Sequence, residues 1–589
     1  MGDRNGEHTF PKQIKSALPK HRHRVFRWDG WGYKDTRFLR DEHGLYCSGS
    51  RYFEAGENHV GSFWSWYKSY YDLEERPVEI VKEPTEFPEP LRNEAFLTKL
   101  KAVGVDYSEK GLHRFMRCHG QSLEDINDTR NLRFNRIPDL VIWPNCHEQV
   151  VQIVELAVQH DIALIPVGGN TSVSGATRTP EIMDRTIAVI DTTQMNRLLW
   201  LSKENLTACF ESGAIGQDIE RVLQKQCLTL GHEPDSYEFS TLGGWISTRA
   251  SGVKKNVYGN IEDLVVRIKV VTPGGVLEKQ FMAARVSCGP DIDHIIFGSE
   301  GTLGVITEAV VKVRPLPEVS KFESLVFRNF RTGVQFVREV AKNRSTPASV
   351  RLMDNTQLKI GRELTASKWH SRISRKLEDF YIEKYFGYSC DDIVTCVVMF
   401  EGTRNTVTCQ QKEIYAIASK YGAIVGGAKR SEKSYRMIFI AAYIRDLAFE
   451  HSIYADSFET SVSWNNTIQL CQNVENIIIT ECKQRFLCPL LSYRLTQSYD
   501  TGCCIYFYLS VKILGSPEHS ARTFMELESI AREAILANGG TVSHHHGIGK
   551  IRSKWYPATV SEAGVGLLKA IKTELDPRNI FAVGNLFPE

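Results

Sequence analysis

From residue 136 onward, short apolar runs alternate with segments whose apolar positions recur at helical spacing. The run at 139–143 predicts a strand, and residues 146–160 predict a helix with one apolar face. A second strand is expected at 162–167, where it leads into a glycine-rich stretch. Strands that alternate with amphipathic helices indicate a domain in which helices pack on a sheet.

A β-hairpin and a second group of strands follow further along the chain. Residues 263–279 predict the hairpin, because the turn residues at 272–275 separate two apolar runs. Helical spacing predicts a helix at 521–538 and another that includes Val565. The second group of strands, with helices between them, indicates an antiparallel sheet. These strands are expected at 349–353, 393–400, 423–426 and 503–510.

The first 135 residues lack this alternation. They open with a basic arm, for which contact with anionic lipid is one interpretation and a solvated, disordered arm is the favoured one. An aromatic cluster between residues 28 and 71 is expected to pack against the body of the protein. The proline-marked stretch 81–90 is the first candidate linker. The cations of the arm are Lys12, Lys15, Lys20, Arg22, Arg24 and Arg27, interleaved with His21 and His23.

Composition narrows the class of protein. The length of 589 residues favours about four domains, and 72 Lys and Arg against 70 Asp and Glu argue against a nucleic-acid partner. Fourteen cysteines without a CxxC pair, and no secretory signal pattern, indicate a reducing compartment. The longest apolar run, 437–444, is far shorter than the ~20 residues of a membrane span. Contact with a membrane surface stays open.

Three stretches rich in Gly, Ser and Thr lie within about 140 residues of one another, at 168–175, 231–252 and 298–307. Small residues let a backbone approach a ligand closely, so that its N–H groups can hold a pyrophosphate. Neither G-x-G-x-x-G after a strand nor G-x-x-x-x-G-K-[ST] occurs there, so Rossmann and P-loop sites are unsupported. Together the three loops predict a large cofactor enclosed by one domain.

Three adjacent histidines at 544–546 are followed directly by Gly547-Ile548-Gly549-Lys550. A tight turn beneath several proton-carrying groups indicates a functional loop. The alternatives are a solvated surface run or a metal-binding tract, as in an expression tag. A predicted helix on either side of the run favours the functional loop.

The glycine-rich loops carry a series of motifs. They read Pro-Val-Gly-Gly-x-Thr-Ser at 166–172, Glu-Phe-Ser-Thr-x-Gly-Gly at 238–244, Thr-Arg-Ala-Ser-Gly at 248–252 and Gly-Ser-Glu-Gly-Thr-Leu-Gly-Val-Ile-Thr at 298–307. This series resembles the FAD-binding domain of the vanillyl-alcohol-oxidase, or PCMH, type of flavoprotein. Gly-His-Glu-Pro-Asp-Ser at 231–236, Arg-Leu-Met-Asp-Asn at 351–355 and the triple histidine are similar to the alkyldihydroxyacetonephosphate synthase family in particular. The resemblance runs from residue 28 to the end of the chain.

The resemblance implies FAD as the cofactor. Asn170 stands where the family usually has a third glycine, and Asn tolerates the left-handed conformation better than most residues. No histidine lies in the first loop, so we expect FAD to be bound non-covalently. The residues implied to contact FAD are Pro166, Val167, Gly168, Gly169, Asn170, Thr171, Ser172, Asp235, Ser236, Ser240, Thr241, Thr248, Arg249, Ala250, Ser251, Glu300, Gly301, Thr302, Leu303, Gly304, Val305 and Ile306.

The resemblance also implies an α+β fold in four parts. A partly helical N-terminal region is expected at 1–135 and a PCMH-type FAD-binding domain at 136–315. An α/β cap domain that binds substrate is expected at 316–540. Residues 541–589 are expected to return the triple histidine to the flavin.

The family's activity, carried over as an expectation, is a step of ether-lipid synthesis that leads to plasmalogens. The acyl chain of acyl-dihydroxyacetone phosphate is exchanged for a long-chain fatty alcohol through a covalent adduct at flavin N5, without net redox. The family also implies a homodimer, peripheral membrane association and a peroxisomal location, with no nucleic acid and no metal. Residues 585–589 are not a Ser-Lys-Leu type signal, so the location rests on the resemblance.

Proton removal beside a ketone needs a base within hydrogen-bond reach and a place for enolate charge. The resemblance assigns the acid/base to Tyr506, although a strand period of two puts Tyr508 on the same face and the pattern alone does not separate them. It assigns substrate binding to Arg445, since a phosphate calls for a fixed cation. The residues implied to act in catalysis are Tyr506, His544, His545, His546 and Arg351.

Two other functions are weighed against this one. A D-2-hydroxyacid dehydrogenase of the same superfamily would carry His-x6-His near Gly-Asp-Gly and a Glu-His-Gly-Ile-Gly ending. Here the matching stretch 497–504 has Asp500 but no histidine, and His545 stands at the Glu position, so three metal ligands are missing. A catalytically silent lipid- or flavin-binding protein is disfavoured by the presence of Tyr506 and Arg445.

Overall fold

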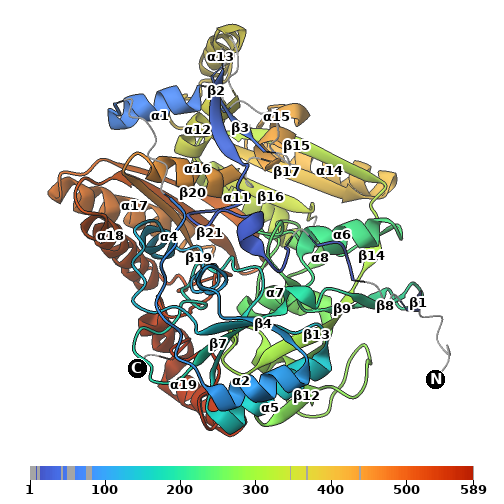
Figure 1. Ribbon diagram of the computed structural model, residues 1–589. Coiled ribbons are helices and arrows are strands. Elements are labelled where there is room, and N and C mark those ends of the chain that lie inside the picture. Colours follow the sequence, from blue (N-terminus) through green and yellow to red (C-terminus); the bar gives the residue numbers. More distant parts are fainter. Residues whose placement is uncertain are drawn as a thin grey trace. The chain divides into compact units, whose positions relative to one another are not determined.

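The structure of the protein is a computed structural model, shown in Figure 1. It describes residues 8–9, 13–16, 18–41, 44–49, 60, 62–74, 82–344, 346–365, 369–436 and 440–587. The chain forms two compact units, each assembled from separated segments. Unit 1 comprises Met1–Asp29, Lys82–Leu316 and His545–Glu589, and unit 2 comprises Gly30–Val81 and Pro317–His544.

Unit 1 contains two main sheets. The larger has the strand order β1-β8-β9-β13-β11-β12 and is antiparallel throughout, whereas the smaller has the order β4-β5-β7-β6 with its last three strands parallel. The strands are β1 (His8–Thr9), β4 (Asp106–Ser108), β5 (Leu140–Trp143), β6 (Ala163–Val167), β7 (Ile187–Asp191), β8 (Leu198–Ser202), β9 (Thr207–Glu211), β11 (Val265–Thr272), β12 (Gly275–Glu278) and β13 (Val305–Lys312).

The parallel strands of unit 1 are almost entirely buried, which explains why they are continuous apolar runs in the sequence. Helices α2 (Glu94–Val103) and α5 (His147–His160) pack on them through one core cluster that includes Phe96, Val150 and Ile153. The predicted strands at 139–143 and 162–167 and the predicted helix at 146–160 are therefore confirmed. The predicted hairpin is confirmed as well, since β11 pairs with β12 and Thr272 lies opposite Gly275.

Unit 2 is built on one antiparallel sheet with the strand order β18-β15-β17-β16-β20-β21-β19. Its strands include those predicted at 349–353, 393–400, 423–426 and 503–510. They are β15 (Val319–Phe327), β16 (Ser349–Met353), β17 (Val394–Gly402), β18 (Ile424–Val425), β19 (Ile453–Ser463), β20 (Pro489–Ser498) and β21 (Gly502–Lys512).

The two faces of this sheet differ in character. Leu352, Phe458 and Phe507 lie on an apolar face, where α11 (Phe330–Lys342), α17 (Thr467–Gln484) and α18 (Pro517–Ala537) pack. The opposite face carries charged and hydroxyl side chains in its middle, and we call it the polar face. Near it lie α1 (Phe63–Tyr71), α12 (Asn355–Thr365), α15 (Ala428–Arg436) and α16 (Ala441–Phe449).

The aromatic cluster expected to pack against the body does so. Phe63, Trp64, Tyr67 and Tyr71 are buried in one core cluster with Leu490 of β20. The hydroxyl of Tyr71 donates to the carbonyl of Ser510 at 2.7 Å.

All fourteen cysteines are free thiols. No helix in the described ranges is long and apolar enough to cross a membrane, and residues 437–439 of the longest apolar run lie outside those ranges.

The units divide the chain differently from the four parts expected from the sequence. The expected boundary at 315 lies next to the division at Leu316, and the candidate linker begins at the division after Val81. No division falls at 135, because residues 82–135 belong to unit 1. The helices of this segment, such as α2, pack on the parallel strands instead of forming a region of their own.

The interpretation of the N-terminal arm as solvated and disordered is wrong at Arg22, although Lys15 and Arg24 of the same arm are exposed. Residues 22–24 form the short 3-10 helix η1 (Arg22–Arg24), and the side chain of Arg22 is 3% exposed. Arg22 is buried because it ion-pairs with Asp191, a carboxylate at the end of β7. Lys12 lies outside the described residues.

Candidate active site

The first two glycine-rich loops lie against each other in unit 1. A Cβ atom on Gly168 would come within 2.1 Å of Oγ1 of Thr241, and one on Gly169 within 2.0 Å of the carbonyl oxygen of Phe239. Contacts this short leave room only for hydrogen, so these two positions require glycine. Thr241 caps helix α7 (Leu242–Thr248) by accepting from the N–H of Gly244.

The third loop joins the other two through Glu300. Its N–H donates to the carbonyl of Ser247 at 2.9 Å, at the end of α7. Its carboxylate accepts from the hydroxyl of Ser174 at 3.1 Å and from the N–H of Ile548 at 2.6 Å. Burial raises the pKa of Glu300, and the hydrogen bonds from these donors oppose that shift. Glu300 therefore ties the first loop to the loop that follows the triple histidine.

The loop after the triple histidine depends on two glycines. Gly547 and Gly549 have φ values of +86° and +51°. A Cβ on Gly547 would lie 2.8 Å from Oε1 of Glu300, and one on Gly549 would lie 2.1 Å from the carbonyl oxygen of Ser174. The turn brings Lys550 into a half-buried position, where it donates to Oδ1 of Asn585 at 2.6 Å. Burial lowers the pKa of Lys550 to about 8.

The first loop has the chemistry to hold a pyrophosphate. Among the described residues, the backbone N–H groups of Gly169, Asn170, Thr171 and Ser172 have no hydrogen-bond acceptor. Asn170 adopts the left-handed conformation with φ of +62°, as its place in the loop requires. Its buried Oδ1 has no hydrogen-bond partner among the residues that the structure describes. Adjacent unpaired N–H groups favour an anionic ligand, so the residues present fit FAD.

Several residues predicted to contact FAD have hydroxyl groups that already bond inside the protein. Ser240 donates to the carbonyl of Ser236 and accepts from the indole N–H of Trp245, and Thr302 donates to the carbonyl of Ser299. Thr248 donates to Gly244 and Ser251 contacts Asn260. Arg249 is exposed and pairs with Glu262. The aliphatic members of the predicted set belong to core clusters, namely Ala250, Leu303, Val305 and Ile306.

The remaining predicted contacts lie around the same loops. Pro166 and Val167 end β6, directly before the first loop. A Cβ on Gly301 would lie 3.3 Å from the ring of Pro166, so the third loop runs beside that strand end. Asp235 and Ser236 are half-buried in the second loop. The structure thus gathers the predicted cofactor residues in one region of unit 1.

In unit 2, Tyr506 lies in a row of polar residues that crosses three strands. It is opposite Glu459 on β19 and opposite Arg494 on β20. Side chains opposite each other in a sheet lie on one face, so all three are on the polar face. The guanidinium of Arg494 lies 5.2 Å from the ring centroid of Tyr506 and 4.9 Å from that of Tyr508. The two tyrosine rings are stacked, with centroids 5.1 Å apart.

Glu459 also fixes the start of the triple histidine. Its buried carboxylate accepts from the hydroxyl of Ser543 at 2.7 Å and from the N–H of His544. The ring nitrogen Nε2 of His544 shares a hydrogen bond with the hydroxyl of Tyr499 at 2.6 Å. His544 therefore has a defined place at the edge of unit 2. His545 and His546 belong to unit 1, where their rings meet edge to face at 4.6 Å.

The two predicted arginines of unit 2 occupy different surroundings. Arg351 lies on β16 with its guanidinium 5.8 Å from the ring centroid of Tyr435, on the polar face. Arg445 lies on α16 and donates from Nε and Nη2 to one oxygen of Asp446, at 3.2 and 3.1 Å. The other oxygen of Asp446 accepts from the N–H of Trp31 at 2.6 Å. Arg445 is thus held in a fixed orientation.

Sequence reasoning missed Arg494, Glu459 and Tyr499. Arg494 is the single charged residue of β20, and Glu459 is the buried one of two acids in β19, where Asp456 is half-buried; charges inside such strands are a signal that the sequence contains. Buried charges of this kind are retained where they have partners or a function. Their relation to Tyr506 needs the strand register, which the sequence alone does not supply.

Comparison with known proteins agrees with this geometry. Residues 138–279 match the family described as FAD binding domain, and residues 316–586 match the family described as FAD linked oxidases, C-terminal domain. A solved structure of p-cresol methylhydroxylase with substrate bound is 14% identical, with a TM-score of 0.64 over 84% of this chain and 96% of that one, and shares the fold. The protein is therefore an FAD-dependent enzyme with a PCMH-type flavin-binding fold.

Nearer relatives define the family. Alkyldihydroxyacetonephosphate synthase of Caenorhabditis elegans is 41% identical over 98% of this chain and 97% of its own length. The enzyme of the same name from Trypanosoma brucei brucei is 33% identical over 87% of this chain and 82% of its own. A solved structure of an alkyldihydroxyacetonephosphate synthase superposes with a TM-score of 0.82 and 27% identity, covering 95% of this chain and 98% of that one. The chain belongs to the alkyldihydroxyacetonephosphate synthase family.

Proposed function

We propose that the protein exchanges the acyl chain of acyl-dihydroxyacetone phosphate for a long-chain fatty alcohol, which yields alkyl-dihydroxyacetone phosphate and a fatty acid. Membership of the synthase family supports this reaction, because relatives that match nearly the whole chain carry that name. Within the structure, the proposed reaction rests on the row of Glu459, Tyr506 and Arg494 on the polar face of unit 2. Bound FAD supplies a nucleophilic ring nitrogen without net redox change.

Tyr506 is the proposed acid and base for the hydrogen next to the ketone. Its side chain is 6% exposed, so it is shielded from competing water, and the hydroxyl of Ser457 lies 3.4 Å from its oxygen. When the phenol gives up its proton, the nearby guanidinium of Arg494 stabilises the negative charge. An acid and base held in this way contributes ~10²–10⁴ in rate.

The substrate's phosphate needs a cation whose orientation is fixed. We assign this contact to Arg445, because its two hydrogen bonds to Asp446 hold the guanidinium plane in place. Arg351 is a second cation of the same unit, on the polar face of the sheet. His545 and His546 carry further hydrogen-bonding groups beside the flavin loops of unit 1, and we assign to them a share in holding the phosphate.

A lipid substrate also accounts for an exposed aromatic surface on unit 2. Helix α13 (Trp369–Tyr381) and the turn η3 (Ile382–Phe386) that follows it expose four large apolar side chains. Side chains of this type enter the interface of a bilayer. We therefore include peripheral membrane association in the proposal, together with a peroxisomal location and a homodimer. The exposed side chains are Leu377, Phe380, Tyr381 and Tyr385.

The deciding experiment gives purified protein palmitoyl-dihydroxyacetone phosphate and labelled hexadecanol. The expected product is hexadecyl-dihydroxyacetone phosphate together with one equivalent of palmitate, and no electron acceptor is consumed. Reduction of an artificial electron acceptor by D-lactate or glycolate, without alkyl product, would overturn the proposal in favour of a dehydrogenase. If the protein binds flavin but catalyses neither reaction, it is a flavin-binding protein without this enzymatic activity.

A further inference from the structure

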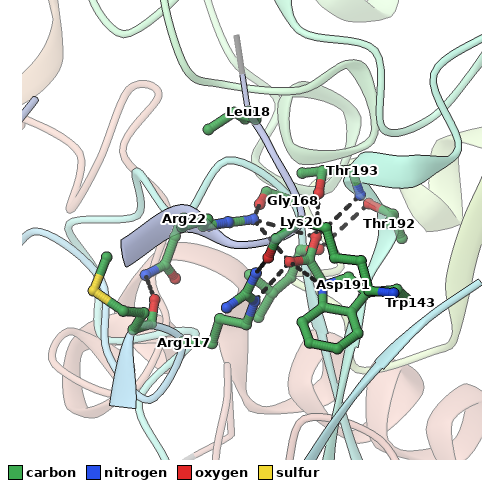
Figure 2. A network of polar contacts seen from close by, with 12 residues as sticks. Leu18, Lys20, Arg22, Arg117, Trp143, Gly168, Asp191, Thr192 and Thr193 are labelled. Atoms are coloured by element: carbon green, nitrogen blue, oxygen red, sulfur yellow. Dashed lines mark hydrogen bonds and ion pairs between the residues drawn. The ribbon is translucent and has the colours of Figure 1, made fainter. Parts of the chain in front are cut away.

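The buried carboxylate of Asp191 forms ion pairs with two arginines, as Figure 2 shows. Arg117 donates to it from Nε at 2.6 Å, and Arg22 of the N-terminal arm approaches both its oxygens at 3.2 Å. Trp143 donates at 3.2 Å, and Thr193 donates from its N–H and its hydroxyl. Three side chains from distant parts of the chain, those of Arg22, Arg117 and Trp143, therefore meet at one carboxylate together with the neighbouring Thr193.

The charges of this cluster do not balance. Two guanidinium groups, on Arg22 and Arg117, face one carboxylate, and in the described part of the chain Asp191 is the acid with which they ion-pair. Both arginines are buried, at 3% and 0% exposure, so solvent screens the remaining positive charge poorly. A charge of this sign beneath a loop that receives a pyrophosphate favours binding of that anion.

Arg22 is also bonded directly to the first flavin loop. The same Nη2 that faces Asp191 donates to the carbonyl oxygen of Gly168 at 2.5 Å. Gly168 precedes the unpaired N–H groups of residues 169–172, so the bond holds the loop at the point where it leaves β6. The hydroxyl of Thr192, next to Asp191, donates to the carbonyl of Val167 at 3.3 Å and holds the same strand end.

The arm contacts the second flavin loop as well. The ring of Phe26 meets the ring of Phe239 edge to face, with centroids 5.2 Å apart. Phe239 is the residue whose carbonyl lies against Gly169. The arm is fixed in turn from below, because Arg117 donates to the carbonyl of Lys20 at 2.9 Å. Residues 20–26 therefore touch both loops between which the cofactor's phosphates are expected.

We propose that the arm at residues 20–26 is a clamp for the flavin loops and that Arg22 is a positioning residue for FAD. Arg22 sets the place of Gly168 and contributes positive charge beneath the loop, without touching the reacting atoms. Binding of FAD and docking of the arm are then linked, since each favours the same arrangement of the loop. FAD should hold the arm down, and the docked arm should tighten the binding of FAD.

The first test measures FAD binding to apoprotein by quenching of flavin fluorescence. Arg22→Gln should raise the Kd for FAD at least tenfold, because it removes the charge and the bond to Gly168. Arg22→Lys keeps the charge but cannot reach both Gly168 and Asp191 with the same geometry, so its Kd should lie between those of the parent and the Gln variant. Arg24→Gln is the matched control, since Arg24 is exposed on the same short helix and should leave Kd within twofold. Unchanged affinity of the Arg22→Gln protein would overturn the proposal.

The second test uses the unmodified protein, so it stands even if Arg22→Gln fails to fold. Trypsin cleavage after Lys15, Lys20 and Arg24 is followed by intact mass, with and without FAD. Linkage predicts cleavage at least fivefold slower with FAD, whereas an arm with a structural role alone would be cut at the same rate in both. Cleavage after the exposed Lys342 or Lys420 is the internal control, since neither lies in the arm.

Discussion

The guanidinium of Arg494 lies over the ring of Tyr506 at 5.2 Å, and the two residues sit opposite each other on neighbouring strands of unit 2. A cation at this distance stabilises the phenolate more than the phenol. If Tyr506 acts as a base, the charge of Arg494 sets the pH range in which it does so.

Replacing Arg494 should therefore shift the pH dependence of the reaction. Ionisation of Tyr506 should appear as a change in kcat at alkaline pH. In Arg494→Met the midpoint of this change should move upward by about one pH unit, which corresponds to ~1.4 kcal/mol of lost stabilisation of the phenolate. Arg494→Lys should shift it less, because the charge is kept. Profiles of kcat against pH for the three proteins check this. A lower rate with an unmoved profile would mean that Arg494 serves only packing.

Tyr506→Phe should abolish the exchange and leave the fold and the bound flavin intact. The lost hydrogen bond should cost ~0.5–1.5 kcal/mol of stability, whereas loss of the acid and base should cost ~10²–10⁴ in rate. The variant should also fail to exchange the substrate's α-hydrogen with solvent deuterium. Tyr508→Phe is the control, since its ring stacks on Tyr506 and meets the same guanidinium. An inactive Tyr508 variant beside an active Tyr506 variant would exchange the two assignments.

Arg445→Lys should raise KM for acyl-dihydroxyacetone phosphate about 10- to 100-fold, because a charge-assisted hydrogen bond is worth ~1.5–3 kcal/mol. An ammonium cannot donate in parallel to Asp446 and to a phosphate as the planar guanidinium can. Steady-state kinetics measure the effect. Arg485→Lys, at a surface ion pair with Glu526, is the control and should change nothing. Binding and turnover within twofold for Arg445→Lys would assign the phosphate to another residue.

FAD should leave the protein on denaturation. The first loop contains no histidine that could carry the flavin, and its fit to the cofactor rests on backbone N–H groups. After acid precipitation the yellow colour should be in the supernatant, and the pellet should lack flavin fluorescence. A protein with covalently bound flavin serves as the comparison. Flavin in the pellet would refute the non-covalent attachment.

Stability should fall in acid through Asp191. Burial alone would raise the pKa of this carboxyl, but the charges of Arg22 and Arg117 and the bonds from Thr193 outweigh it and lower the pKa to about 2. Because the folded value lies below the ordinary 3.8, the contribution is complete above about pH 4 and is lost as the pH falls towards 2. It amounts to ~2 kcal/mol. The free energy of unfolding, measured with urea between pH 5 and 2.5, should fall less steeply with decreasing pH for Asp191→Asn than for the parent protein. An equal pH dependence in both proteins would contradict the ion-pair cluster.

The elements that the sequence predicted well are those that depend on local pattern. The buried strands at 139–143 and 162–167 are continuous apolar runs, and the turn at 272–275 has the residues that its hairpin needs. The glycines of the first loop are expected from the sequence to let the backbone approach a ligand, and the structure adds a second reason for them, since close contacts with the second loop exclude any side chain at Gly168 and Gly169.

The features that the sequence did not predict depend on contacts between distant segments. Nothing near Arg22 in the chain shows that it would meet Asp191, which lies 169 positions away. The basic composition of the arm therefore suggests a solvated segment, although Arg22 is buried at the first flavin loop. In the same way, Glu459 and Arg494 become neighbours of Tyr506 only through the register of three strands. Hydroxyl groups such as that of Ser240 were expected at the cofactor, and instead they satisfy buried donors and acceptors.

The segment around Phe581 completes a part of unit 1 that is made much earlier in synthesis. Phe581 pairs with Leu164 beside β6, and the N–H of Leu164 donates to the carbonyl of Ile580 at 2.8 Å. Strand β6 is thus synthesised early and receives its neighbour only after residue 581 has been made. A premature stop before residue 580 would leave this strand, which leads directly into the first flavin loop, without that neighbour.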